Sequence, residues 1–201
     1  MAKQKTSTQA SAVVTGAGSG IGRAFALALA ARGGRVICAD INLATAQETV
    51  DMIAAKGGQA HALRCDVSQL AEVEALADQA EAWLRGPVDL VINNAGVGAG
   101  GQLVGDMLMA DWQWALGINL WGVIHGCHVF APRLRTLGRG GIINVCSTAS
   151  FAAAPRMAAY NVSKAAALAL SETLSAEMAG TGIAVTALCP TFVKTNIARD
   201  G

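Results

Sequence analysis

The sequence predicts a single α/β domain in three layers, with a parallel sheet covered by helices on both faces. Apolar runs of strand length alternate with longer stretches of helical spacing, and Gly, Asn, Asp or Pro marks each switch. This alternation is typical of a parallel sheet. The runs AVVT, VICA, LVIN, IINV and AVTAL lack the polar alternation of a half-exposed strand, which indicates burial on both faces. The length of 201 residues suits one such domain and is too short for two.

The switches divide the chain into six strands and five helices. We expect strands over residues 12–15, 35–39, 60–64, 88–92, 141–146 and 183–188, and helices over residues 20–32, 43–56, 69–85, 111–137 and 157–180. Residues 1–11 are polar and predict a disordered N-terminal tail, so the domain is expected to occupy residues 12–201.

The last expected strand, residues 183–188, raises a question about the sheet edge. It is nearly all apolar, as a strand with neighbours on both sides would be, yet no later segment could pair with its outer edge. We therefore predict that the natural protein continues past Gly201 with a seventh strand, and that the domain is C-terminally incomplete here.

The composition excludes several classes of function. Apolar residues make up 53% and charged residues 14%, and the formal net charge of +1 provides no basic field for nucleic acid. The longest apolar stretch, residues 24–31, is too short to span a membrane. The polar N-terminus lacks a secretory signal, which predicts a cytoplasmic protein. The 5 cysteines are odd in number and form no C-x-x-C pair, so we expect reduced thiols without disulfides.

A glycine-rich turn, TGAGSGIG over residues 15–22, joins the first expected strand to the first helix. Its spacing is T-G-x-x-x-G-x-G, since Ile21 stands where G-x-G-x-x-G would have its third glycine. At such a junction, backbone N–H groups and the positive helix end can bind a pyrophosphate. A merely flexible turn is the alternative, and the strand-to-helix position argues against it.

Asp40 ends the second expected strand, roughly 20 residues beyond the glycines, where a carboxylate can accept hydrogen bonds from the adenosine ribose. It would repel a 2′-phosphate, and no Arg or Lys stands at Ser19 or directly after Asp40. NAD is therefore favoured over NADP. Alternatively, Asp40 caps the next helix, a role that Asn42 could also fill.

Further cofactor contacts are expected where later strands end. Asp66 follows the third strand and could reach the adenine, and the small-residue turn NNAG follows the fourth. The complete set of predicted cofactor residues is Gly16, Ser19, Gly20, Ile21, Asp40, Asp66, Val67, Asn93, Ala95, Gly96, Tyr160, Lys164, Pro190, Val193 and Thr195.

Tyr160, the only tyrosine, precedes Lys164 by four residues at the start of an expected helix, so both side chains project from one face. A phenol is a poor base at neutral pH, but a nearby ammonium and a cationic nicotinamide would stabilise the phenolate. Tyr160 could then act as a general acid and base. Ser147 follows an apolar strand, at the edge where open α/β sheets bind ligands. Asn119 could hold a water that relays a proton to Lys164.

Six motifs in this order and spacing resemble the short-chain dehydrogenase/reductase family: TGAGSGIG, NNAG, INLWG, NVCSTAS, YNVSK and CPTFVKT. The resemblance covers residues 12 to about 195. It implies a doubly wound, Rossmann-type nucleotide-binding fold and a catalytic tetrad of Asn119, Ser147, Tyr160 and Lys164. It also implies that Lys164 binds the nicotinamide ribose and that Thr195 contacts the nicotinamide end. Thr191 departs from the family, which usually has glycine after this proline.

These observations predict an NAD-dependent dehydrogenase acting on a secondary alcohol or ketone. The apolar character around Ser147 favours a lipophilic substrate, such as a steroid, a fatty or acyl alcohol, or an aromatic alcohol. The predicted pocket residues are Ser147, Phe151, Met157, Thr191 and Phe192. An NADP-dependent carbonyl or 3-oxoacyl reductase and a non-catalytic nucleotide-binding scaffold remain the alternatives.

Two further expectations concern partners and metals. The resemblance implies a homo-oligomer, a dimer or tetramer, formed through the long helices. His125, Cys127 and His128 lie together in one expected helix, but no further ligands stand at a recognisable spacing. We therefore expect packing or subunit contact there and no metal site.

Overall fold

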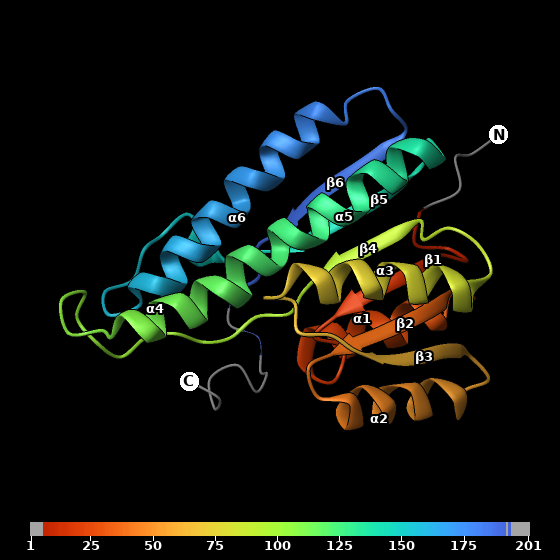
Figure 1. Ribbon diagram of the computed structural model, residues 1–201, viewed down its shortest axis with the longest axis horizontal. Helices are drawn as coiled ribbons and strands as arrows, with labels where there is room; N and C mark the ends of the chain where they lie inside the picture. The colour runs from red at the N-terminus through yellow and green to blue at the C-terminus, as the bar shows by residue number, and fades with distance from the viewer. Residues whose placement is uncertain (1–5, 192, 194–201) are drawn as a thin grey trace.

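The fold is a six-stranded parallel sheet between two layers of helices (Figure 1). The computed structural model describes residues 6–191 and 193. The strand order is β3-β2-β1-β4-β5-β6, and every strand pair is parallel. The strands are β1 (Ser11–Thr15), β2 (Arg35–Asp40), β3 (Gln59–Arg64), β4 (Leu90–Asn93), β5 (Gly140–Val145) and β6 (Ile183–Leu188). The chain winds outward from β1 to β3, returns to β4 beside β1, and continues outward in the other direction. The predicted doubly wound sheet is confirmed.

Each face of the sheet buries its own apolar cluster. One cluster joins Val14 of β1 to α1 (Gly20–Ala30) and α2 (Leu43–Ala54). The other joins Val13 to the helices of the opposite layer, which are α3 (Leu70–Leu84), α5 (Gly122–Leu137) and α6 (Ala158–Glu177). Successive strand residues therefore supply opposite faces, and burial on both faces explains the continuous apolar runs.

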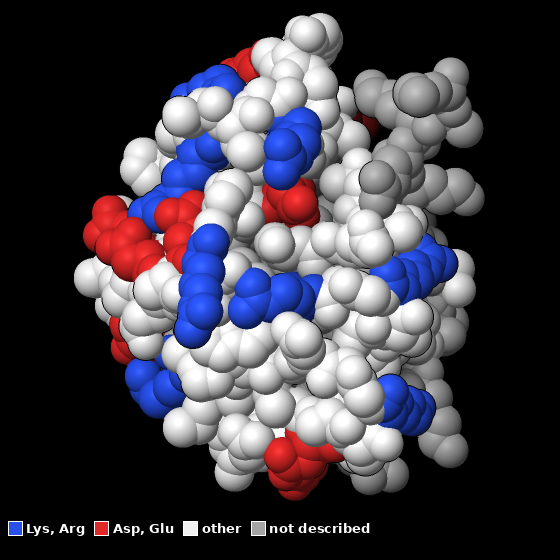
Figure 2. Space-filling view, turned by 90° about the vertical axis from the view of Figure 1, so that its right-hand side faces the viewer, with Lys and Arg blue, Asp and Glu red and all other residues white. Residues whose placement is uncertain are grey.

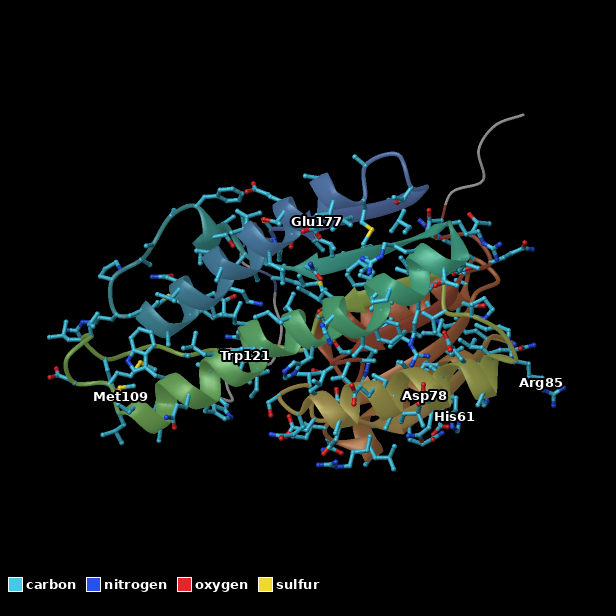
Figure 3. All side chains as sticks on the ribbon, turned by 45° about the horizontal axis from the view of Figure 1, so that its top comes forward. His61, Asp78, Arg85, Met109, Trp121 and Glu177 are labelled. Atoms are coloured by element: carbon cyan, nitrogen blue, oxygen red, sulfur yellow. The ribbon has the colours of Figure 1, made fainter. Side chains whose placement is uncertain are left out.

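The single long helix expected over residues 111–137 is instead three segments. α4 (Met109–Leu116) leads into a π-helical turn, Gly117–Trp121, and α5 follows it. Within this turn the N–H of Gly122 bonds to the carbonyl of Gly117, five residues earlier. Figure 3 shows Met109 at the end of the molecule opposite Arg85, with Trp121 further along this helical stretch, toward the middle.

The disordered tail predicted over residues 1–11 does not extend as far as Ser11. Ser11 is the first residue of β1, Ala10 is buried, and the N–H of Gln9 bonds to the carbonyl of Arg32. The hydroxyl of Ser7 accepts a hydrogen bond from Arg32. Pairing of the strand with its neighbours orders these polar residues, which have no helical or strand signal of their own. Residues 1–5 lie outside the described part.

β6 forms the last strand of the described sheet and pairs with β5 along its whole length. Only Ile183 of its six residues is fully buried, so β6 is less covered than the central strands. The seventh strand stays a prediction.

The described surface carries mixed charge. On the face in Figure 2, Lys and Arg side chains alternate with Asp and Glu among broad uncharged areas, and no basic stripe crosses that face. None of the helices in the described part of the chain has the length and hydropathy that crossing a bilayer requires.

Candidate active site

The candidate site lies where the order of the strands reverses, at the carboxyl ends of β1 and β4. Open α/β sheets bind ligands at such a reversal point. Gly16 follows β1 with a φ of +63°, and a Cβ atom there would lie 2.9 Å from the Cα of Ala95 in the turn after β4. Glycine is therefore required both by the backbone conformation and by this close approach.

The glycine turn leaves the N-terminus of α1 free to meet an anion. Ser19 and Gly20 are exposed, the Ser19 side chain makes no capping hydrogen bond, and the first turn holds no acidic residue. A Cβ atom at Gly22 would lie 2.1 Å from the carbonyl oxygen of Gly16, so the helix packs directly on the turn. Backbone N–H groups and the positive end of the helix thus share one exposed edge, which fits a pyrophosphate.

Asp40, the last residue of β2, closes the other side of this turn. Its Oδ2 accepts a hydrogen bond from the N–H of Gly18 at 2.8 Å, and its Oδ1 accepts one from the N–H of Asn42 at 3.0 Å. The side chain of Asn42 is the one that caps α2, where it accepts from Ala44 and Thr45. Helix capping therefore belongs to Asn42, and the Asp40 carboxylate stands beside the expected nucleotide site.

Arg23 is a neighbour of this site that the sequence interpretation missed. From the first turn of α1 its guanidinium donates to the carbonyl of Gly18, to the hydroxyl of Thr49 at 3.0 Å and to Glu48 at 2.9 Å. A cation near a helix N-terminus is electrostatically unfavourable without such acceptors, and that position was the available signal. Through these bonds Arg23 braces the glycine turn against α2.

The turn after β4 is anchored by Thr15 and Asn94, neither of which was predicted. The hydroxyl of Thr15 accepts from the N–H groups of Asn94 and Ala95 at 3.0 and 3.1 Å. The side-chain amide of Asn94 donates to the carbonyls of Thr15 and Gly16 at 2.9 and 3.2 Å. These four bonds hold the two ligand-facing turns together.

The Asn93 side chain lies in the protein interior and does not face the expected cofactor site. Its side chain is buried and donates to Asn144 at 2.8 Å, and Asn144 in turn donates to Ser171 at 2.9 Å. Gly126 of α5 allows this network, because a Cβ there would lie 2.0 Å from the Oδ1 of Asn93. The Asn93 side chain thus joins the strands to the helix layer, which leaves only its backbone for the predicted cofactor contact.

The predicted residues after β3 are held by local bonds. The Asp66 carboxylate accepts from the N–H and the hydroxyl of Ser68 at 3.0 and 2.7 Å. Val67 is buried against Gly122, and its carbonyl lies 2.9 Å from the Nδ1 of His125. His125 thereby fixes the end of β3 to α5.

Lys164 and Tyr160 meet on one face of α6. The Nζ of Lys164 lies 5.8 Å from the centre of the Tyr160 ring. The same nitrogen donates to the carbonyl of Val145, at the end of β5, at 2.9 Å. Burial lowers the pKa of the Lys164 ammonium from 10.5 to about 8, while the nearby Cys146 and Cys189 raise it. At neutral pH the amine therefore stays mostly protonated beside the phenol.

Ser147 stands between two contacts to Lys164. It follows the carboxyl end of β5, its own hydroxyl accepts from the N–H of Ala149 at 3.1 Å, and it is nearly buried. Ser150, on the next turn (Thr148–Ser150), donates to the backbone carbonyl of Lys164 at 2.8 Å. The segment that carries Ser147 is thus fastened to α6 on both sides, and Ser150 is a positioning residue that the sequence interpretation missed.

Asn119 sits in the π-helical turn, fully buried. Its Oδ1 accepts from the N–H of Val97 at 2.8 Å and its Nδ2 donates to the carbonyl of Val97 at 2.9 Å. A Cβ atom at Gly96 would lie 3.0 Å from this Oδ1 and 3.4 Å from the Nζ of Lys164. Asn119 and Lys164 therefore converge on Gly96, and the Asn119 side chain is held there by Val97 through its Oδ1 and one of its two amide hydrogens.

The predicted substrate pocket is partly described. Phe151 is 70% exposed, Thr191 is exposed and Met157 is half-buried, whereas Phe192 lies outside the described residues. The ring of Tyr160 packs with an apolar group made of Met107, Trp112 and three alanines, Ala99, Ala115 and Ala159.

Two of the three predicted cofactor residues near the C-terminus, Pro190 and Val193, belong to the described part of the chain. The Pro190 carbonyl accepts from the N–H of Thr148 at 3.0 Å, and Val193 is exposed. Thr195 lies outside the described residues.

The model of the short chain dehydrogenase family matches residues 10–200. The chain belongs to this family. It is 43% identical over 185 residues to the Mycobacterium tuberculosis protein named "Probable oxidoreductase EphD", covering 92% of this chain and 31% of that protein. It is 38% identical to the 7alpha-hydroxysteroid dehydrogenase of Escherichia coli K12, covering 94% of this chain and 73% of that enzyme.

A solved structure shares the fold closely. The crystal structure of a short chain dehydrogenase/reductase from Burkholderia phymatum, in complex with NAD, superposes with a TM-score of 0.94 at 41% identity. The alignment covers 98% of this chain and 70% of that one. The expected family and the Rossmann-type fold are confirmed, while this chain spans under a third of the EphD relative.

Proposed function

We propose that this chain catalyses NAD-dependent oxidation of a secondary alcohol, or the reverse reduction of a ketone. The observation that carries the proposal is the buried Lys164 ammonium, 5.8 Å from the Tyr160 ring and bonded to the strand end that precedes Ser147. A phenol next to a fixed cation is suited to exchange a proton with a substrate hydroxyl.

The side chains divide the work as follows. Tyr160 takes the hydroxyl proton in the oxidative direction, and Ser147 holds the substrate oxygen by a hydrogen bond. Lys164 stabilises the phenolate and binds the nicotinamide ribose, while Asn119 links the site to solvent water. Bound NAD supplies the hydride acceptor, and the protein contributes positioning and electrostatics.

The choice of NAD rests on Asp40. Its carboxylate already accepts from the glycine turn through Gly18 and has free lone pairs to accept ribose hydroxyls. Arg23, a cation at the turn, already donates to the Gly18 carbonyl, Thr49 and Glu48, so contact with a 2′-phosphate would compete with these partners. The NAD complex of the Burkholderia phymatum relative is consistent with this choice.

A lipophilic substrate is favoured by the apolar surroundings of Tyr160. Met107 and Trp112 pack against the same cluster of alanines as Tyr160, and Phe151 presents an exposed aromatic surface on the segment after Ser147. One relative is named for a hydroxysteroid, a substrate of this character. We therefore place steroid, fatty or acyl, and aromatic alcohols first in the search. A homo-oligomer and a cytoplasmic location stay predictions.

The decisive experiment is a panel of secondary alcohols with NAD, followed by NADH absorbance, on the wild type and on Tyr160→Phe. We expect turnover by the wild type, a loss of about 10²–10⁴-fold in kcat for Tyr160→Phe, and little change in NADH affinity by fluorescence titration. Val162→Ala, an exposed change two residues along α6, is the matched control and should keep activity. Undiminished turnover by Tyr160→Phe would refute its role as the base.

The same titration separates the alternatives. We expect NADH to bind at least about tenfold more tightly than NADPH, a difference of about 1.4 kcal/mol. Tighter binding of NADPH would favour a carbonyl or 3-oxoacyl reductase. Nucleotide binding without turnover of any alcohol or ketone would favour a non-catalytic nucleotide-binding protein.

A further inference from the structure

Two cysteines stand side by side at the carboxyl ends of β5 and β6. Val145 pairs with Leu188 in the register of the two strands, and the N–H of Cys146 donates to the carbonyl of Leu188 at 2.8 Å. The next residues along each strand, Cys146 and Cys189, are therefore direct neighbours. Val145 and Leu188 pack on the α1 and α2 side, whereas both cysteines pack on the opposite side. Both thiols thus project from the same face of the sheet.

The separation of the two strands suits a bond between these thiols. Neighbouring strands lie about 4.8 Å apart, within the range of roughly 4.4–6.8 Å between Cα atoms that disulfides span. The two side chains also sense each other. Burial is the main reason why the pKa of Cys146 is raised to about 11, and interaction with Cys189 adds to the rise. Cys146 is buried and Cys189 is half-buried, so Cys189 is the thiol that solvent can reach.

We propose that Cys146 and Cys189 form a reversible disulfide when a hydroperoxide oxidises the protein. The Cys189 sulfur attacks one peroxide oxygen, an S–O bond forms and the O–O bond breaks, and the leaving oxygen takes the thiol proton and departs as water or an alcohol. The Cys146 sulfur then attacks the sulfenic sulfur, the S–S bond forms, and the S–O bond breaks. The hydroxide that leaves takes the thiol proton and becomes water. Two thiols are oxidised and one peroxide is reduced.

Another thiol lies near Cys146 but is engaged elsewhere. Cys146 contributes to the raised pKa of Cys127 of α5, yet the Cys127 sulfur lies 3.7 Å from the Nδ2 of Asn93 and 3.5 Å from that of Asn144. Cys127 is also buried, so it is not the thiol that a peroxide in solvent can reach. It lies on α5 and is therefore not a neighbour of Cys146 within the sheet. The register therefore selects Cys189.

The disulfide would act on the catalytic segment, a consequence that rests on the proposed function. Cys146 lies between the Val145 carbonyl, which binds the Lys164 amine, and Ser147. Cys189 precedes Pro190, whose carbonyl accepts from the N–H of Thr148. A disulfide fixes the two Cβ atoms about 3.8 Å apart and so constrains the ends of both strands. A displacement of the catalytic segment by as little as about 1 Å can lower turnover on the order of 10²-fold.

The test begins with peptide mapping of the wild-type protein. After treatment with hydrogen peroxide and blocking of free thiols, a non-reducing tryptic digest should contain residues 140–156 linked to residues 165–194. Dithiothreitol should separate the two peptides. A link from residues 140–156 to residues 86–133, which carry Cys127, would overturn the proposal, and so would Cys146 or Cys189 found only as sulfinic or sulfonic acid.

Two variants make the assignment specific. Cys189→Ser should remove the linked peptides, whereas Cys127→Ala, the matched control, should retain them. Turnover with NAD and an alcohol should fall at least about tenfold in the oxidised wild type, return with dithiothreitol, and persist in peroxide-treated Cys189→Ser. A linked wild type with unchanged turnover would overturn the effect on the site. The linkage is measured by mass, so it is decided even if the proposed dehydrogenase activity fails.

Discussion

The buried amine of Lys164 predicts an unusual dependence of stability on pH. Lys164 is only 3% exposed, and burial lowers the pKa of its amine from 10.5 to about 8. Below about pH 8 both the folded and the unfolded chain hold the proton, and the folded state carries the full cost of the buried charge. As pH rises from 8 to 10.5, the folded protein loses this proton before the unfolded chain does. The cost therefore disappears and the protein gains stability with pH.

The size of the effect follows from the shift. Holding the ammonium at neutral pH costs about 3 kcal/mol, of which roughly 2.5 kcal/mol should be recovered between about pH 7 and pH 10. Lys164→Met removes the charge and keeps an unbranched side chain. It also leaves the Val145 carbonyl without its partner, but that loss does not depend on pH and cancels in the comparison.

Urea denaturation at these two pH values measures the difference. Both proteins should carry Tyr160→Phe, so that Lys164 is the only member of this neighbouring pair that can change its charge. We expect the stability of Lys164→Met relative to its parent to fall by about 2.5 kcal/mol from the lower to the higher pH. Lys56→Met, at an exposed position, is the control and should show no such change. If the stability of Lys164→Met relative to its parent stays constant or rises from pH 7 to pH 10, the argument is refuted.

Three further changes probe the nucleotide site and its support. Asp40→Ala should weaken NADH binding about tenfold in a fluorescence titration, because both the ribose acceptor and the bond to Gly18 are lost. The protein's preference for NADH over NADPH should therefore narrow, and an unchanged preference would contradict the role of Asp40. Gly126→Ala should cost about 1–3 kcal/mol in urea, since its Cβ would overlap a buried amide, while Gly86→Ala, with no atom within 4 Å, should be near neutral. Thr15→Val should cost about 2 kcal/mol by leaving two N–H groups unpaired, and an unaffected midpoint would show that water replaces the hydroxyl.

The strands were predictable because burial on both faces leaves a direct trace in the sequence. The run LVIN, for example, is fully buried in β4. Helix ends were less predictable. The helix expected over residues 20–32 ends at Ala30, as α1. Ala31 still has helical φ and ψ angles, so the sequence carries no signal that marks the end two residues early. The π-helical turn was not predictable, because GINLW suits an ordinary helix, and the bonds from Asn119 to a distant loop decide its form.

The site was predictable to the level of which residues gather there. The tetrad residues follow strand ends or share a helix face, and these are local patterns. To predict the different roles of Asn93 and Asn94, one would have to know where β4 ends, because neighbouring strand residues face opposite sides of the sheet. Val91 packs toward α5, so Asn93, two residues later, faces the same way, and this period was the available signal. The meeting of Cys146 and Cys189 depends on strand register, which a single sequence does not show.

The π-helical turn has a consequence for how this gene can tolerate change. A helix usually tolerates the loss of one codon poorly, but residues 117–121 form a widened turn between two α-helical segments. This turn holds one residue more than an α-helical turn, so removing one amino acid there would let ordinary winding resume while α5 keeps its rotation relative to α4. A deletion within α4 or α5 would instead rotate the rest of the helix by about 100° and turn its apolar stripe away from the sheet. In a library of single-codon deletions selected for folding, these five positions should therefore be less depleted than the flanking helices.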